Sequence, residues 1–219
     1  MRPREQELRA GLLALKLDLG DVQVGQLLDY LDLIGKWTQV YNLTAVRDPA
    51  EMLTHHLLDS LAAIPPLRRH LQQAGLQAGS RLLDVGSGAG LPGVVIAICC
   101  QEVTVTCVDT VSKKAAFIQQ TALSLKLPNL SGLHARVEKV RQSFEVVSSR
   151  AFASLADFTQ WSAATLAPGG VWMAMKGKHP TDEITALPAD VEVFHVEQLA
   201  VPGLDAERCI LWMRQKTTV

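Results

Sequence analysis

Two spacings of apolar residues divide the chain. Up to about residue 74, apolar residues recur every three or four positions, which is the period of an amphipathic helix. From residue 81 onward, short apolar runs alternate with helical stretches, which is typical of a parallel sheet. The spacing predicts helices over residues 4–17, 24–41, 51–63 and 67–74, with Pro65 and Pro66 ending the third.

The second part of the chain reads as repeated strand and helix units. Apolar runs predict strands at 82–85, 103–108, 130–134, 144–148 and 171–175, with helices at 94–98, 112–126 and 154–166. A last pair of strands is expected at 191–199 and 209–213. We expect an α/β fold in which an N-terminal helical extension (1–75) packs on a sheet domain (76–219).

The stretch Asp84-Val85-Gly86-Ser87-Gly88-Ala89-Gly90-Leu91-Pro92-Gly93 reads as strand, glycine turn and helix start. Glycines permit positive φ and close approach of a ligand, and we place Pro92 at the first helical position. The N-terminus of such a helix has free backbone amides, which bind the polar or anionic end of a ligand. The turn contains a dinucleotide fingerprint, Gly88-x-Gly90-x-x-Gly93. It also resembles motif I of class I S-adenosylmethionine (SAM) methyltransferases, and the acid at position 84 favours SAM.

Other residues have two interpretations each. Asp109 ends the second predicted strand, where an acid can bind both ribose hydroxyls of a nucleoside, or can cap the helix at Ser112. His55 and His56 do not share a helix face, so a metal site is disfavoured, and a contact between His55 and Asp59 is possible. We expect Trp37 and Tyr41 to pack in the core rather than to stack on bases.

Composition narrows the class of protein. The chain has 219 residues, 48% of them hydrophobic, and no apolar run approaches the roughly 18 residues of a membrane span. The charged N-terminus does not lead into a secretory signal. The four cysteines lie in apolar patterns without metal-ligand spacing, which predicts buried free thiols and a reducing cytoplasm. A net charge of −1 disfavours nucleic-acid binding by the surface as a whole but leaves a local basic face open.

Five segments together resemble one family. They are Tyr41-Asn42-Leu43-Thr44-Ala45, His55-His56-Leu57-Leu58-Asp59-Ser60-Leu61, the glycine turn, Ser149-Arg150-Ala151-Phe152-Ala153-Ser154-Leu155 and Met175-Lys176-Gly177. They look like segments of the RsmG family, also called glucose-inhibited division protein B, from about residue 27 to the terminal strands. These are 16S ribosomal RNA guanine-N7 methyltransferases. The resemblance implies a class I SAM-dependent methyltransferase fold, Rossmann-like, with a seven-stranded, mostly parallel sheet and helices on both faces.

The resemblance also implies an activity and a site. The expected reaction is SAM-dependent N7 methylation of one guanine in the 530 loop of 16S rRNA, at position 527 in the usual ribosomal numbering. The family pattern carries cofactor binding onto Gly86, Gly88, Leu91, Asp109, Val137, Glu138 and Arg150.

The chemistry of the expected reaction is simple. Guanine N7 has a free lone pair, so we expect no catalytic general base, and we expect no metal. The Asn/Asp-Pro-Pro-aromatic segment common in exocyclic-amine methyltransferases is absent after the fourth strand. Arg150 could bind the guanine Hoogsteen edge or the SAM carboxylate, or form a salt bridge within the fold. Phe152 could stack on the base, although core packing is favoured.

Basic residues near the ends of the strands are candidates for RNA contact. They are Arg47, Arg136, Lys139, Arg141, Lys176 and Lys178. Because the net charge is −1, we expect the substrate to be rRNA within the 30S subunit or an assembly intermediate. Three alternatives stay open: an NAD-dependent oxidoreductase, a SAM enzyme acting on a small molecule, and a non-enzymatic RNA- or protein-binding module.

Overall fold

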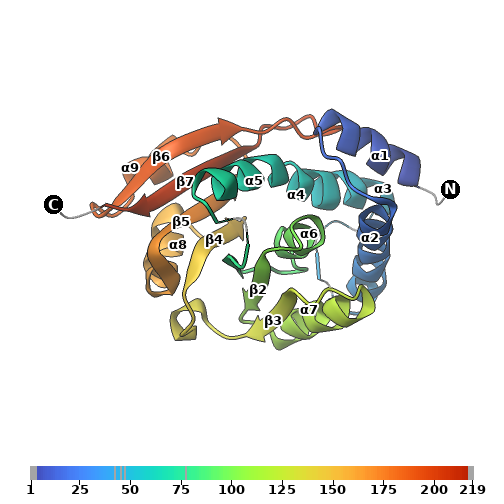
Figure 1. The fold of residues 1–219 in the computed structure, drawn as a ribbon, viewed down its shortest axis with the longest axis horizontal. Helices are drawn as coiled ribbons and strands as arrows, with labels where there is room; N and C mark the ends of the chain where they lie inside the picture. Colours follow the sequence, from blue (N-terminus) through green and yellow to red (C-terminus); the bar gives the residue numbers. More distant parts are fainter. Residues whose placement is uncertain (1–3, 42, 45, 47, 77, 217–219) are drawn as a thin grey trace.

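The centre of the molecule is a twisted sheet. The computed structural model describes residues 4–41, 43–44, 46, 48–76 and 78–216. Within them a seven-stranded sheet has the order β3-β2-β1-β4-β5-β7-β6 (Figure 1). The strands are β1 (Arg81–Val85), β2 (Thr104–Asp109), β3 (Leu130–His134), β4 (Phe144–Arg150), β5 (Leu166–Lys176), β6 (Val191–Gln198) and β7 (Cys209–Gln215). Strands β1 to β5 pair in parallel and β7 is antiparallel to both neighbours, which confirms the predicted sheet.

Two hydrophobic cores lie one on each face of the sheet, and alternate residues of β1 and β4 enter them. Leu82 and Val146 belong to the first core, whereas Leu83 and Val147 belong to the second. Helices α6 (Gly93–Cys99) and α7 (Ser112–Ser124) cover the first face. The second face carries α8 (Leu155–Ser162), α9 (Thr181–Thr185) and two 3-10 turns, Val137–Lys139 and Ala163–Thr165. The predicted helices on both faces are confirmed.

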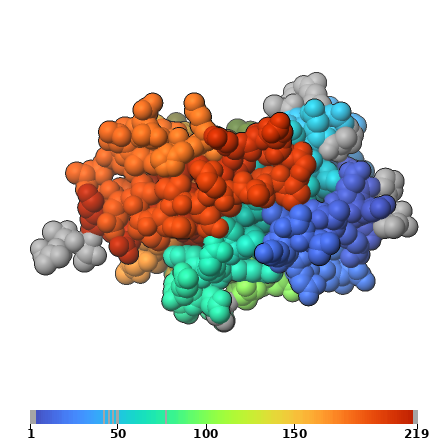
Figure 2. All heavy atoms as spheres, turned by 90° about the horizontal axis from the view of Figure 1, so that it is seen from above, coloured from blue at the N-terminus to red at the C-terminus, as the bar shows by residue number. Residues whose placement is uncertain are grey.

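The N-terminal helices pack on the first face and share its core. They are α1 (Glu5–Ala14), α2 (Asp21–Tyr41), α3 (Pro49–Met52), a π-helical segment (Leu53–Leu58), α4 (Asp59–Leu61) and α5 (Ile64–Gln73). Figure 2 shows these blue and teal helices beside the orange-to-red C-terminal strands. The ring of His70 stacks on Trp212 at 4.6 Å between centroids. A boundary at residue 75 therefore marks a change of secondary structure and not a gap in packing, and the two-domain division stays our proposal.

Several local predictions are wrong. Pro65 and Pro66 do not end a helix but occupy the first turn of α5, where a missing N–H costs nothing. Pro92 is the N-cap of α6 and not its first residue. Strand β5 begins at Leu166, five residues before the predicted strand at 171–175, and α9 was not predicted. Trp37 packs against the core as expected, whereas Tyr41 is 43% exposed.

The described residues also bear on compartment and membrane. All four cysteines are buried and free, as predicted. Burial raises the pKa of the Cys100 thiol to about 11, so it stays protonated. Of the helices in the described part, none is both long and apolar enough to cross a membrane.

Candidate functional site

The glycine turn joins β1 to α6 at the carboxyl edge of the sheet. Gly86, Gly88 and Gly90 have φ values of 64°, 57° and 88°, a region that favours glycine. Above Gly88 a Cβ would meet nothing within 4 Å, which leaves space for a ligand. At Gly90 and Gly93 a Cβ would come within 2.5 Å of Val94 and 2.3 Å of Cys107. The last two glycines of the dinucleotide fingerprint therefore allow the turn to pack closely against neighbouring side chains of the protein.

Asp84 holds the turn from beneath. Its carboxylate is fully buried and accepts hydrogen bonds from the Gly93 N–H at 3.0 Å and the Ser148 hydroxyl at 2.9 Å. Burial raises the pKa of this carboxyl to about 7, although both hydrogen bonds act in the opposite direction. The acid that favoured SAM in the sequence thus fixes the start of α6 and lines neither pocket described next.

One cavity, the Asp109 pocket, opens on one side of the turn. It has a volume of about 470 Å³, and its lining includes Gly86, Asp109, Val137, Glu138 and Trp161. The site prediction contained the first four of these residues and missed Trp161. The structure therefore brings four of the seven residues predicted to bind the cofactor into one cavity.

Asp109 also organises the protein around this pocket. One carboxylate oxygen accepts from the Gly88 N–H at 3.0 Å and the other from the Val111 N–H at 2.9 Å. Asp109 thus fixes the segment before α7 and also lines the pocket, and its binding of ribose hydroxyls stays a prediction. Each carboxylate oxygen has a second lone pair that a ribose hydroxyl can use.

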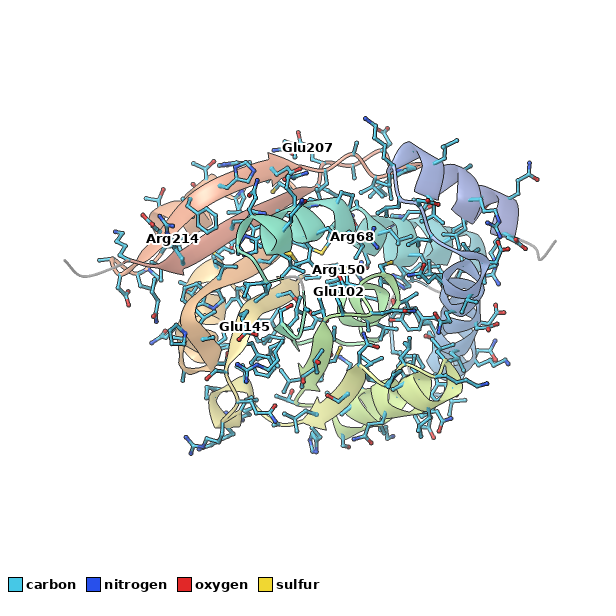
Figure 3. The ribbon with its side chains drawn as sticks, in the orientation of Figure 1. Arg68, Glu102, Glu145, Arg150, Glu207 and Arg214 are labelled. Carbon is cyan, nitrogen blue, oxygen red and sulfur yellow. The ribbon has the colours of Figure 1, made fainter. Side chains whose placement is uncertain are left out.

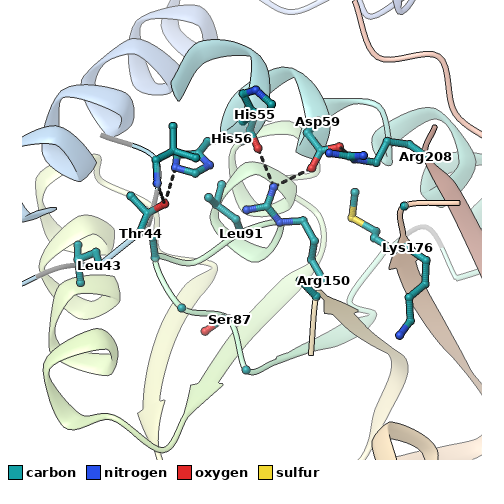
Figure 4. A pocket seen from close by; sticks show the side chains of 17 residues that line it. Leu43, Thr44, His55, His56, Asp59, Ser87, Leu91, Arg150, Lys176 and Arg208 are labelled. Carbon is teal, nitrogen blue, oxygen red and sulfur yellow. Dashed lines mark hydrogen bonds and ion pairs between the residues drawn. The ribbon is translucent and has the colours of Figure 1, made fainter. Parts of the chain in front are cut away.

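A second cavity, the Arg150 pocket, opens on the other side of the turn. Its volume is about 490 Å³, and Gly86 lines both cavities. The predicted residues Gly88, Leu91 and Arg150 line it, together with Lys176 (Figure 4). Its outer wall comes from the N-terminal extension through Thr44 and the π-helical segment. The seven predicted cofactor residues are thus divided between two cavities that meet at Gly86.

Asp59 joins two arginines in the wall of the Arg150 pocket. Its oxygens accept from Arg150 Nη1 at 2.8 Å and from Arg208 Nε at 2.8 Å, and its side chain is only 5% exposed. Arg150 Nη1 also donates to the carbonyl of His55 at 2.9 Å. Figure 3 shows Arg150 near the centre of the molecule. The salt-bridge interpretation of Arg150 is correct, and the expected contact between the side chains of Asp59 and His55 is replaced by these arginine contacts.

This ion pair leaves part of Arg150 available. Among the described residues, its Nη2 and Nε atoms have no hydrogen-bond partner, and the side chain lines the pocket. Arg208 was missed by the sequence prediction because no motif marks the loop before β7. The pocket wall therefore presents guanidinium N–H groups, the donors that suit a carboxylate or a guanine Hoogsteen edge.

His56 is a buried neutral imidazole in the same wall. Its Nε2 lies 2.9 Å from Thr44 Oγ1, which also accepts from the Val46 N–H at 3.2 Å. Burial, with the nearby Arg150 charge, lowers the His56 pKa to about 4. The hydroxyl of Thr44 and the His56 ring therefore share a hydrogen bond, and the histidine anchors the chain segment after α2. No group of three His, Cys, Asp or Glu residues in the described part has metal-binding geometry.

Phe152 lies over the turn where the two cavities meet. A Cβ on Gly86 would come within 2.2 Å of its ring. The ring contacts Phe158 and Trp161 edge-on, at 6.4 and 5.9 Å between centroids, and packs against the second core. Core packing, the favoured interpretation, is thus what the structure shows, although the ring also lines the Asp109 pocket.

The predicted RNA-contact residues lie in two groups. Arg136, Lys139 and Arg141 are exposed after β3, and Arg136 lines the Asp109 pocket. Lys178 is exposed after β5, whereas the Lys176 ammonium bonds both oxygens of Glu183 at 3.0 and 2.8 Å. Arg47 lies outside the described residues. Contact of this set with RNA stays a prediction.

Comparison with known proteins decides the family. A model of the GidB family, described as rRNA small subunit methyltransferase G, matches residues 23–211. The chain belongs to this family. It is 76% identical over 217 residues to the "Ribosomal RNA small subunit methyltransferase G" of Polaromonas sp. (strain JS666), covering 99% of this chain and 96% of the relative.

Two solved structures share the fold at low identity. TrmN from Thermus thermophilus has a TM-score of 0.55 at 18% identity, covering 75% of this chain and 53% of TrmN. The ribosomal protein L11 methylase from Lactobacillus delbrueckii subsp. bulgaricus has a TM-score of 0.54 at 13% identity, covering 73% of this chain and 77% of that protein. The fold is the class I methyltransferase fold, and the chain is a SAM-dependent methyltransferase of small-subunit rRNA. The NAD-dependent alternative is set aside.

Proposed function

We propose that this enzyme methylates N7 of one guanine in the 530 loop of 16S rRNA, at position 527 in the usual ribosomal numbering. The observation that carries the proposal is the meeting of two cavities at Gly86. One contains an acid suited to a nucleoside, and the other exposes guanidinium N–H groups beside the glycine turn. A methyl donor and a base can thus meet at the turn from opposite sides, which is the positioning that such a transfer requires.

We assign the cofactor to residues of both cavities. Asp109 would bind the ribose hydroxyls, and the Val137–Glu138 pair would border the adenine. Gly86, Gly88 and Leu91 would contact the cofactor at the turn. Arg150 would bind either the SAM carboxylate or the guanine Hoogsteen edge with the N–H groups that Asp59 leaves available.

Two side chains of the Arg150 pocket, His56 and Asp59, are poorly suited to act as a general base. SAM, when bound, supplies a sulfonium-activated methyl group that N7 can take in one displacement. The His56 imidazole has a pKa of about 4, which makes it a poor base at neutral pH. Both oxygens of Asp59 already accept from arginines. What the chain contributes is therefore placement and exclusion of water.

The substrate we propose is 16S rRNA in the 30S subunit or in an assembly intermediate, in the bacterial cytoplasm. With a net charge of −1, the enzyme lacks the overall positive field that attracts naked RNA. The enzyme would instead recognise the 30S particle through shape complementarity.

The test is transfer of labelled methyl from SAM to 30S subunits from a strain that lacks this enzyme. The 16S rRNA is digested to nucleosides, and we expect the label in 7-methylguanosine alone. Label in another methylated nucleoside would contradict N7 chemistry, and unlabelled RNA despite SAM binding would contradict the RNA substrate. A kcat that rises tenfold per pH unit between pH 6 and 8 would contradict the absence of a general base.

A further inference from the structure

Helix α2 brings an aromatic ring to the edge of the sheet where the site lies. Near the start of α2, Gln26 donates to the carbonyl of Leu125 at the far end of α7. At its end, Tyr41 meets Lys113 in the first turn of α7. The two helices therefore run in opposite directions past each other, and Tyr41 lies at the carboxyl edge of the parallel strands.

The ring of Tyr41 packs against a neighbouring ring but stays partly exposed to solvent. Trp37 packs against Phe117 of the core at 5.2 Å between centroids, and Tyr41 leans on Trp37 at 5.1 Å. The side chain nevertheless stays 43% exposed. The ammonium of Lys113 lies 5.1 Å from the ring centroid. A cation–π contact at so exposed a site is weak, so a phosphate can draw the ammonium away.

This pair lies next to both cavities along the chain. Tyr41 precedes Leu43 and Thr44, which line the Arg150 pocket. Lys113 lies between Val111 and Lys114, which line the Asp109 pocket. An RNA strand that places one base in the site would therefore pass close to Tyr41 and Lys113.

We propose that Tyr41 and Lys113 contact the RNA strand beside the target guanine, and this inference rests on the proposed function. A base that enters the site leaves its stack, so its neighbour loses a stacking partner. The exposed ring of Tyr41 offers that neighbour a replacement surface, and the Lys113 ammonium pairs with a phosphate of the same strand.

The test compares four variants by their KM for 30S subunits, their KM for SAM and their thermal unfolding. Tyr41→Ala should raise the KM for 30S about tenfold or more, because loss of a base–aromatic stack has an effect of this order. Tyr41→Phe should stay within about twofold of the wild type. Neither variant should change the KM for SAM. Lys36→Ala, an exposed lysine on the same helix, is the matched control and should change nothing.

Lys113→Ala tests the phosphate contact separately. The slope of log KM for 30S against log salt should become shallower by about 0.7, which is the contribution of one phosphate on a single strand. An unchanged KM for 30S in Tyr41→Ala, while the wild type methylates the particle, would overturn the inference and leave the proposed function standing. A wild type that transfers no methyl to RNA would instead contradict the proposed function.

Discussion

Tyr30 of helix α2 braces the glycine turn from the N-terminal extension. Its phenol donates to the carbonyl of Ala89 at 2.6 Å, and Ala89 lines the Arg150 pocket. The ring is fully buried, and burial raises the Tyr30 pKa well above 10, so the phenol stays protonated and able to donate. We predict that Tyr30→Phe loosens the turn, because it removes this hydrogen bond and keeps the shape of the ring.

The magnitude follows from what Tyr30→Phe leaves behind. The Ala89 carbonyl becomes a buried acceptor without its donor, which costs about 1–2 kcal/mol of unfolding free energy. For a domain of this size the melting temperature should fall by about 2–8 °C. The turn contacts the cofactor in our assignment, so the Kd for SAM should rise by about 3–10-fold.

The assay pairs thermal unfolding with calorimetric titration of SAM. Thr38→Val is the matched control, since the Thr38 hydroxyl is buried on the same helix without a partner among the described residues. The control should keep both the melting temperature and the SAM affinity. A Tyr30→Phe protein that loses stability but binds SAM as tightly as the wild type would refute the proposed support of the turn by Tyr30. One with unchanged melting temperature and SAM affinity would refute a stabilising hydrogen bond.

Three further changes test other parts of the site. Asp59→Ala should cost about 3 kcal/mol of unfolding free energy in urea, because it leaves two arginines facing each other. Glu145→Ala, which breaks an exposed ion pair, should cost under about 1 kcal/mol. Equal losses in the two variants would contradict the argument. Between pH 6.5 and about 4, only the unfolded state protonates His56. Lowering the pH through this range should therefore reduce the stability advantage of the wild type over His56→Gln by about 3 kcal/mol. A difference that stays constant with pH would show that the histidine titrates normally. Gly86→Ala should abolish SAM binding in a titration, because φ is 64° and the added Cβ would meet an aromatic ring at 2.2 Å; unchanged binding would remove the turn from the site.

The order of strands and helices was predictable because local patterns determine it. Buried strands read as continuous apolar runs, and the glycine turn requires backbone conformations that few other residues adopt. Residues 166–170 were not predictable as strand, since Pro168 and two glycines usually mark a turn. Pro65 and Pro66 are equally ambiguous, because proline can follow the end of one helix or begin the next.

The lining of the Asp109 pocket was largely predictable, whereas the outer wall of the Arg150 pocket was not. Gly86, Asp109 and the 137–138 pair lie at the ends of strands, so topology alone gathers them. Arg208 meets Asp59 across 149 positions of sequence, and no spacing rule reports such a contact. Tyr41 follows the same helical spacing as the buried residues of α2, and it is exposed because it is the last residue of that helix.

The location of the methyl group tests the central claim most directly. The wild-type enzyme is incubated with SAM and 30S subunits from a strain lacking it, and the 16S rRNA is treated with borohydride and aniline, which cleave at 7-methylguanosine. Reverse transcription should then give one new stop, at the 530-loop guanine. A stop at any other guanine would contradict the proposed substrate, and no new stop despite SAM binding would contradict N7 methylation of this RNA.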